Sequence, residues 1–219
     1  MKLVVLKFGG TSVADVPQIK KIALKVKGEV ELGNNVIVVV SAMSGVTNNL
    51  INLVEKASKN FPYSEYDTIL STGEQVTSAL LSIALEELSL KARSWMGWQV
   101  PIISDNTYGK AIIKEIKTTN IINSIKKGYV AIVSGFQGIS QENRITTLGR
   151  GGSDTTAVAL AAAFSADRCD IYTDVDGVYT TDPRIVKNAK KLEYITYEEM
   201  LELASQGAKV LQTRSVALA

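Results

Sequence analysis

The segment Leu3-Val-Val-Leu-Lys-Phe-Gly-Gly-Thr-Ser12 contains a short apolar run that ends directly in a pair of glycines. Short runs that are apolar on both faces and rich in β-branched residues are typical of strands buried inside a parallel sheet. Glycine lets the backbone approach a ligand closely and adopt a positive φ. The segment therefore predicts a buried strand followed by a turn that can hold a ligand.

Four further runs have the same character, namely Val36–Val40, Val100–Ile103, Tyr129–Val133 and Asp170–Tyr172. Between the runs, apolar residues recur at helical spacing. These positions are Ile19, Ile22, Ala23, Val26 and Val30 (with Pro17 in the first turn), then Leu50, Leu53, Val54 and Ala57, then Val76, Ala79, Leu80, Ile83 and Ala84. Two more helices are expected, a mostly buried one over Thr155–Ala163 and another from about Tyr197 to Ala208.

Strands that alternate with helices predict an α/β fold, here a three-layer α/β/α sandwich around a largely parallel central sheet. We expect a single domain over residues 1–219, because the chain has no linker rich in proline, glycine or serine and no repeat. In open sheets of this kind, ligands bind beyond the carboxyl ends of the strands. The turns that follow the predicted strands are therefore the places to look for function.

The composition excludes several classes of enzyme. The 219 residues include no histidine and one cysteine, so Ser-His-Asp hydrolysis, Cys-His proteolysis and histidine-based zinc sites are ruled out. A net charge of +2 does not favour binding to nucleic acid. No apolar run is long enough for a signal peptide or a membrane helix, so we expect a cytoplasmic location and no membrane partner.

The first two turns contain small and polar residues. In Lys7–Ser12, backbone N–H groups can point at an anion while Lys7 supplies a positive charge. The alternative is an ordinary strand-to-helix turn with a surface lysine. In Ser41–Thr47, three hydroxyls and a glycine can bind a carboxylate or a phosphate, and the alternative is a loop whose hydroxyls cap a helix.

The third and fourth turns each precede a predicted helix. In Leu70–Gln75, Glu74 either points into a cleft or simply favours the helix dipole. In Thr146–Asp154, three glycines, Arg150, Ser153 and Asp154 stand before a helix whose N-terminus attracts anions. Arg150 can hold a carboxylate with two hydrogen bonds, and Asp154 can bind Mg²⁺ or orient a lysine. This turn matches neither Gly-x4-Gly-Lys-Ser/Thr nor Gly-x-Gly-x-x-Gly.

The fifth turn, Tyr172–Arg184, mixes acidic, hydroxyl, aromatic and basic groups. Tyr179 can stack on a base and Arg184 can bind phosphate oxygens. A solvated acidic turn is the alternative reading of this segment. Asp174, Asp176 and Gly177 match only the beginning of a calcium-binding loop, since its later ligands are missing.

Taken in order, the five turns resemble the amino-acid kinase family and, within it, the aspartate kinase branch. The matching strings are Lys-Phe-Gly-Gly-Thr-Ser-Val at 7–13, Val-Val-Val-Ser-Ala-Met at 38–43, Ser-Thr-Gly-Glu at 71–74, Thr-Leu-Gly-Arg-Gly-Gly-Ser-Asp at 147–154, Tyr-Thr-Asp-Val-Asp-Gly-Val-Tyr-Thr-Thr-Asp-Pro-Arg at 172–184 and Gly-Ala-Lys-Val-Leu at 207–211. The resemblance implies transfer of the ATP γ-phosphate to the side-chain carboxylate of L-aspartate, with Mg²⁺, as the first step toward lysine, threonine and methionine. It also implies a homodimer.

The resemblance assigns roles to individual residues. Lys7 and Asp154 would be catalytic. The nucleotide would be bound by Lys7, Phe8, Gly9, Gly10, Thr173, Asp174, Tyr179, Arg184 and Lys209. L-Aspartate would be bound by Ser41, Thr47, Glu74, Arg150, Gly151, Gly152 and Ser153, with Glu74 pairing to its amino group. A carboxylate is already ionised at neutral pH, so the reaction needs no general base and the lack of histidine is no obstacle.

Two features depart from the family pattern. After Ser215-Val-Ala-Leu-Ala219, aspartate kinases usually continue with a last strand and paired ACT regulatory domains, so we expect an incomplete catalytic domain without feedback control. Leu211-Gln-Thr-Arg-Ser215 stands where the family usually has Leu-His-Pro-Arg-Ser. The alternative to an active kinase is therefore a fragment that binds aspartate or nucleotide without efficient turnover.

Overall fold

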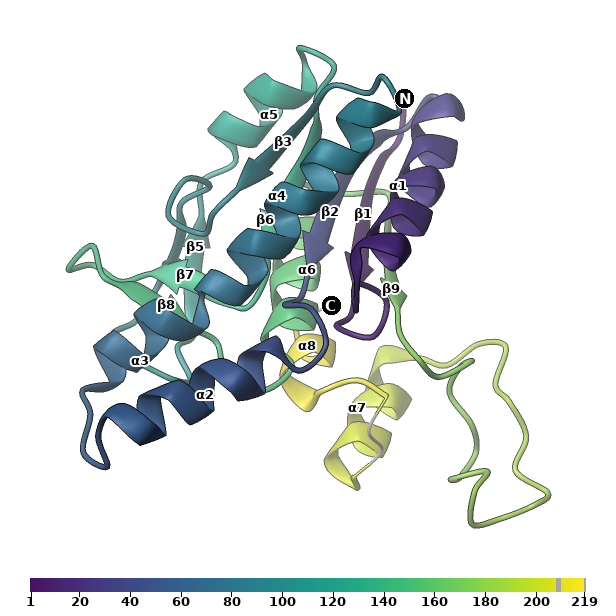
Figure 1. The fold of residues 1–219 in the computed structure, drawn as a ribbon. Helices are drawn as coiled ribbons and strands as arrows, with labels where there is room; N and C mark the ends of the chain where they lie inside the picture. Colours follow the sequence, from purple (N-terminus) through teal and green to yellow (C-terminus); the bar gives the residue numbers. More distant parts are fainter. Residues whose placement is uncertain (208–209, 219) are drawn as a thin grey trace.

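The computed structural model describes residues 1–207 and 210–218 (Figure 1). Its central element is a five-stranded sheet in the order β3-β6-β2-β1-β9. The strands are β1 (Leu3–Phe8), β2 (Asn35–Val40), β3 (Ala92–Trp95), β6 (Val130–Ser134) and β9 (Arg168–Tyr172). Every neighbouring pair is parallel. The expected parallel sheet is therefore confirmed, with β3 as a strand that the sequence did not predict.

Helices cover both faces of this sheet. One face carries α1 (Val16–Glu31) and α4 (Thr72–Glu87), and the other carries α5 (Thr119–Ile125) and α6 (Gly152–Ala163). Successive residues of a strand point to opposite faces. Accordingly Val4, Leu6 and Phe8 pack on the α1 side, while Val5 packs on the α6 side. Two hydrophobic cores result, as a three-layer sandwich requires.

A second, four-stranded sheet lies beside the first. Its order is β5-β4-β7-β8, with β4 (Ile102–Ser104), β5 (Ile113–Ile116), β7 (Gln137–Ile139) and β8 (Ile145–Thr147). The strand predicted over 100–103 begins later, at Ile102, and lies in a mixed sheet, because β4 pairs parallel with β7 at Ile103 but antiparallel with β5. A hydrogen-bonded turn in which Gln99 and Val100 both donate to Met96 O delays the start of the strand.

The predicted helices form, with two corrections. Asp15 caps α1, and Pro17 lies in its first turn, where the missing N–H is tolerated. In α4 the predicted buried face is partly wrong, because Val76 and Ile83 are exposed. The buried face instead carries Glu74 together with small or hydroxyl residues near the N-terminus and leucines further along. This end of α4 packs under a polar site and not under the apolar core.

The remaining helices lie around the cavity described below. They are α2 (Val46–Ala57), α3 (Tyr63–Leu70), α7 (Tyr197–Ser205) and α8 (Thr213–Val216). The helix predicted to run to Ala208 ends at Ser205, and Ala208 lies outside the described residues. Between β9 and α7 the chain makes a long excursion away from the sheet, joined to itself by a bridge between Tyr179 and Lys191 (Figure 1). In the described ranges, no helix combines the length and the apolar character needed to cross a membrane.

Candidate active site

A cavity of about 480 Å³ lies at the carboxyl ends of β1, β2 and β9 and reaches the N-termini of α4 and α6. This is the edge of a parallel sheet at which ligands bind. Most of the predicted site residues line it: Lys7, Gly9, Gly10, Ser41, Thr47, Glu74, Arg150, Gly151, Gly152, Ser153, Asp154, Thr173 and Asp174. The fold therefore brings residues of all five turns together at one cavity, and of the fifth turn only Thr173 and Asp174 line it.

Three predicted residues do not line the cavity. Phe8 is buried on the α1 side, where its ring stacks on Tyr172 at 4.7 Å. It points away from Lys7 because adjacent strand residues face opposite sides of the sheet. Tyr179 donates to Asp176 and Arg184 to Asp182, both within the long excursion after β9. Lys209 lies outside the described residues.

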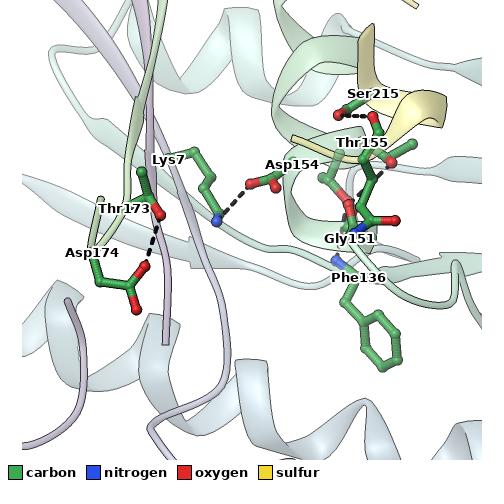
Figure 2. Close-up of polar contacts among 11 residues, drawn as sticks. Lys7, Phe136, Gly151, Asp154, Thr155, Thr173, Asp174 and Ser215 are labelled. Atoms are coloured by element: carbon green, nitrogen blue, oxygen red, sulfur yellow. Dashed lines mark hydrogen bonds and ion pairs between the residues drawn. The ribbon is translucent and has the colours of Figure 1, made fainter. Parts of the chain in front are cut away.

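Lys7 and Asp154 form an ion pair inside the cavity (Figure 2). The Nζ atom of Lys7 lies 2.6 Å from Oδ1 of Asp154, and the two side chains are only 9% and 14% exposed. Lys7 is the one polar residue of the central strand β1, where its neighbours are Val39 of β2 and Ile171 of β9, and Asp154 lies in the first turn of α6. A charge held in such surroundings needs a partner, and Asp154 supplies it.

Glu74 is the second buried charged group of the cavity. Its side chain is 3% exposed, and Oε1 accepts a hydrogen bond from Ala42 N at 3.0 Å. Within the described ranges Oε2 has no hydrogen-bond partner. Burial raises the pKa of the Glu74 carboxyl to about 7. A carboxylate in this state gains most from a cationic ligand that supplies the missing hydrogen bond.

The Gly9-Gly10 turn brings two backbone segments into close contact. A Cβ atom on Gly10 would lie 3.1 Å from the carbonyl oxygen of Ala42, so a side chain here would push the two turns apart. Ser12 and Val13 both donate their backbone N–H to Gly9 O, which fixes the shape of the turn. Backbone amides and a lysine at one end of a strand favour anion binding.

The segment Gly149–Ser153 closes the opposite wall. The structure begins α6 at Gly152, earlier than the predicted Thr155, so Ser153 and Asp154 belong to the first helical turn. No side chain caps this N-terminus, and Gly151 adopts a left-handed φ of 71°. Gly152 N donates to Gly149 O, so the amides that this turn offers to an anion are those of Ser153 and Asp154. Arg150 is exposed, and within the described part of the chain its guanidinium has no polar partner.

Residues outside the predicted set also shape the site. Asp67 and Arg214 bond to the backbone around residues 147 and 148, and Gln212 packs against Gly151. Gln212 is one of the two residues that depart from the family pattern. A Cβ on Gly151 would lie 2.2 Å from its Cγ, so Gln212 packs directly behind this part of the cavity wall. The sequence held no local signal for Asp67, one of two acids in a short helix.

Comparisons with known proteins agree with this geometry. Residues 2–219 match the model of the amino acid kinase family. The chain is 54% identical over 221 residues to an aspartokinase of Rickettsia prowazekii. It superposes on the crystal structure of an aspartate kinase from Synechocystis with a TM-score of 0.88 and 49% identity, covering 99% of this chain and 36% of that one. It also superposes on E. coli aspartokinase III in complex with aspartate and ADP, with a TM-score of 0.89 and 31% identity, covering 100% and 59%.

The chain spans about half the length of the curated relatives it matches, 50% in the case of the Rickettsia protein. The match nevertheless covers the whole α/β sandwich and every turn of the cavity. From the family match and the fold, the chain belongs to the amino acid kinase family.

Proposed function

We propose that this chain carries the catalytic domain of an aspartate kinase, which transfers the γ-phosphate of ATP to the side-chain carboxylate of L-aspartate. The observation that supports this most is that one cavity combines the Lys7–Asp154 pair with a separate buried carboxylate, Glu74, that has an oxygen without a partner in the described residues. The similarity to a kinase solved with aspartate and ADP supports the same reading.

The amino-acid half of the site would lie between Glu74 and Arg150. Glu74 suits the ammonium group of an amino acid, because an ionised Oε2 gains both a hydrogen bond and an opposite charge. Arg150 suits a carboxylate, which its planar guanidinium can bind with two parallel hydrogen bonds. Ser41, Thr47 and Ser153 add hydroxyl groups to the same wall, which Gly151 and Gly152 complete with their backbone.

The phosphate half would lie between β1 and α6. Lys7 supplies a positive charge, and Gly10 and the uncapped N-terminus of α6 supply backbone amides, while Gly9 N donates to Tyr172 O and holds the turn against β9. Asp154 holds Lys7 in place through the ion pair. Thr173 and Asp174, which are hydrogen-bonded to each other, would contact the nucleotide at the end of β9 (Figure 2).

The chemistry then follows from positioning and charge neutralisation. An oxygen of the substrate side-chain carboxylate attacks the γ-phosphorus and forms a new O–P bond. The bond from the γ-phosphorus to the β,γ-bridging oxygen breaks, and ADP leaves with that electron pair. No proton has to move, so no general base is needed. The product is 4-phospho-L-aspartate, an acyl phosphate.

The carboxylates of the cavity suit a magnesium ion that arrives with the nucleotide. In the described ranges no group of three or more acidic, cysteine or histidine side chains could hold a metal by itself. Mg²⁺ is usually held by one or two carboxylates together with substrate phosphates, and Asp154 and Asp174 provide two. Bound there, Mg²⁺ would neutralise charge on the phosphate oxygens.

Three assignments are proposed from the resemblance alone. Tyr179 and Arg184 would reach the nucleotide from the excursion after β9, and Lys209 would join them. A homodimer, the lysine, threonine and methionine pathways and a cytoplasmic location are likewise proposed from the resemblance.

The direct test is an assay that traps acyl phosphates as hydroxamates. The purified chain is incubated with ATP, Mg²⁺ and hydroxylamine, with either L-aspartate or L-glutamate. The proposal expects hydroxamate with L-aspartate and little with L-glutamate. Aspartate binding in calorimetry without any hydroxamate would instead identify a binding fragment. Product with L-glutamate alone would contradict the assigned substrate.

A further inference from the structure

A buried carboxylate outside the cavity joins two segments that are far apart in sequence. Asp67, in α3, is fully buried and receives four hydrogen bonds. Its Oδ2 accepts from Thr147 N at 2.8 Å, and its Oδ1 accepts from Thr147 Oγ1 at 2.7 Å. Both oxygens also accept from Gly109 N, at 3.0 and 2.9 Å. The four hydrogen bonds come from three donors, Gly109 N, Thr147 N and Thr147 Oγ1, and a carboxylate can accept from all of them.

A positive side chain joins the same two segments from the other side. Arg214, in α8, donates from Nη1 to Leu148 O at 3.0 Å and to Ala111 O at 3.4 Å. The segments also bond directly, because Ala111 N donates to Thr147 O at 2.8 Å. Residues 109–111 and 147–148 are therefore clamped by one anion and one cation. We call these two side chains the loop clamp.

The clamped residues lead directly into the wall of the cavity. Gly149 follows Leu148 and packs so closely on the 109–111 segment that a Cβ would lie 3.1 Å from Gly109 O. Arg150 comes next, and because its guanidinium has no polar partner in the described ranges, only the backbone fixes its position. Glycine at three of the five positions from 149 to 153 leaves that backbone free to adopt many conformations.

From this arrangement we infer that Asp67 and Arg214 are positioning residues for substrate binding. Neither lines the cavity, yet both fix the backbone from which Arg150 and Ser153 reach it. The inference rests on the proposed function, since it concerns the amino-acid half of that site. The clamp sets the position of the carboxylate-binding arginine before the substrate arrives, which lowers the cost of ordering it.

The consequence is a selective effect on L-aspartate. Loosening the clamp displaces Arg150 and leaves the Gly9-Gly10 turn, which is built on β1, in place. Misplacement of a binding group by about 1 Å costs up to about 100-fold. We therefore expect Asp67→Asn and Arg214→Met to raise the KM for L-aspartate by about 10- to 100-fold. The KM for ATP should change far less.

The experiment measures the KM for both substrates in the hydroxamate assay and the Kd for L-aspartate by calorimetry. Asp105→Asn is the matched control, because Asp105 accepts from Thr107 N and Ile112 N within the same loop but does not contact residues 147–148. Thr147→Ser keeps both donors to Asp67 and should behave like the wild type. If Asp67→Asn fails to fold, Arg214→Met on the surface helix α8 carries the test.

The outcomes separate the clamp from the proposed function. If the wild-type chain binds L-aspartate without turnover, the proposed activity is contradicted. Weaker binding of L-aspartate by the clamp variants would then still support the clamp. An unchanged KM and Kd in Asp67→Asn and Arg214→Met would overturn the clamp while leaving the activity in place. An equal rise in the KM for ATP, together with lower stability, would mean that both residues support the fold in general. That result would also overturn the clamp.

Discussion

The ammonium of Lys7, at the end of β1, lies 2.6 Å from the carboxylate of Asp154, in the first turn of α6. The pair joins the strand that leads into the Gly9-Gly10 turn to the helix whose preceding loop carries Arg150. Since the pair is almost fully buried, the ligand that approaches Lys7 meets a cation in a low-dielectric wall, where its field is strongest.

Replacing Lys7 should remove most of the turnover and leave the fold in place. Loss of one group that stabilises transition-state charge costs about 100- to 1,000-fold in kcat. We expect Lys7→Met to show this loss in the hydroxamate assay, with an unchanged circular dichroism spectrum. Lys20→Met is the control, because Lys20 is a surface lysine of α1 that pairs with Glu87. A folded Lys7→Met variant with the wild-type rate would remove Lys7 from the catalytic centre.

Glu74 should make aspartate binding depend on pH. Burial raises the pKa of this carboxyl to about 7, so it is largely neutral below that pH and loses its attraction for an ammonium group. The Kd for L-aspartate should therefore rise as the pH falls from 8 to 6. Glu74→Gln should weaken binding by about 10- to 100-fold and abolish that pH dependence.

The control for this prediction is Glu86→Gln, an exposed glutamate of the same helix. It should bind L-aspartate as the wild type does at every pH. Wild-type binding that stays constant between pH 6 and 8, measured by calorimetry, would mean that Glu74 does not hold the ammonium group.

The same carboxyl should affect stability in the absence of ligand. A carboxyl whose pKa is raised on folding stabilises the protein below its unfolded pKa, and this contribution is lost as the pH rises through the folded pKa. For Glu74 the window runs from 4.5 to about 7. Its contribution to the free energy of unfolding should fall by about 3 kcal/mol across that window. Urea unfolding of the wild type and Glu74→Gln at several pH values isolates the contribution of Glu74. If the free energies of unfolding of the two proteins changed in parallel with pH, this prediction would be refuted.

Gly151→Ala should disturb the amino-acid half of the site in two separable ways. The left-handed φ of 71° strains any side chain, and the new Cβ would lie 2.2 Å from Gln212 Cγ. We expect lower stability and a higher KM for L-aspartate, both partly restored in the double variant Gly151→Ala, Gln212→Ala. Gly128→Ala is the control, since its φ is similarly +80° but a Cβ there meets nothing within 4 Å. If the second substitution restores nothing, Gln212 does not constrain the loop.

The sequence predicted what depends on local pattern. Buried strands such as β1 and β2 are continuous apolar runs, and the glycine-rich turns after them mark where the backbone must approach a ligand. The strand β3 escaped prediction because its residues, Ala-Arg-Ser-Trp, do not form an apolar run. The buried face of α4 was partly misassigned, since Glu74 and its hydroxyl neighbours face inward while Val76 and Ile83 face solvent.

Features that depend on contacts between residues far apart in the sequence could not be predicted. Asp67 matters because α3 brings it against Thr147 and Gly109, and no spacing in the sequence records that approach. Tyr179 and Arg184 follow a strand that ends at the cavity, so the sequence places them near it. The excursion after β9 instead carries them to local partners, Asp176 and Asp182.

An ¹⁸O-labelling experiment can show whether the side-chain carboxylate of L-aspartate accepts the γ-phosphate. L-Aspartate labelled with ¹⁸O in its side-chain carboxylate is incubated with ATP and Mg²⁺, and the product is cleaved by hydroxylamine, which attacks the acyl carbon and expels phosphate. If that carboxylate is the nucleophile, each phosphate released in this step carries one ¹⁸O. Phosphate that contains no ¹⁸O would show that the γ-phosphate went to water or to another acceptor, and would contradict the assigned reaction.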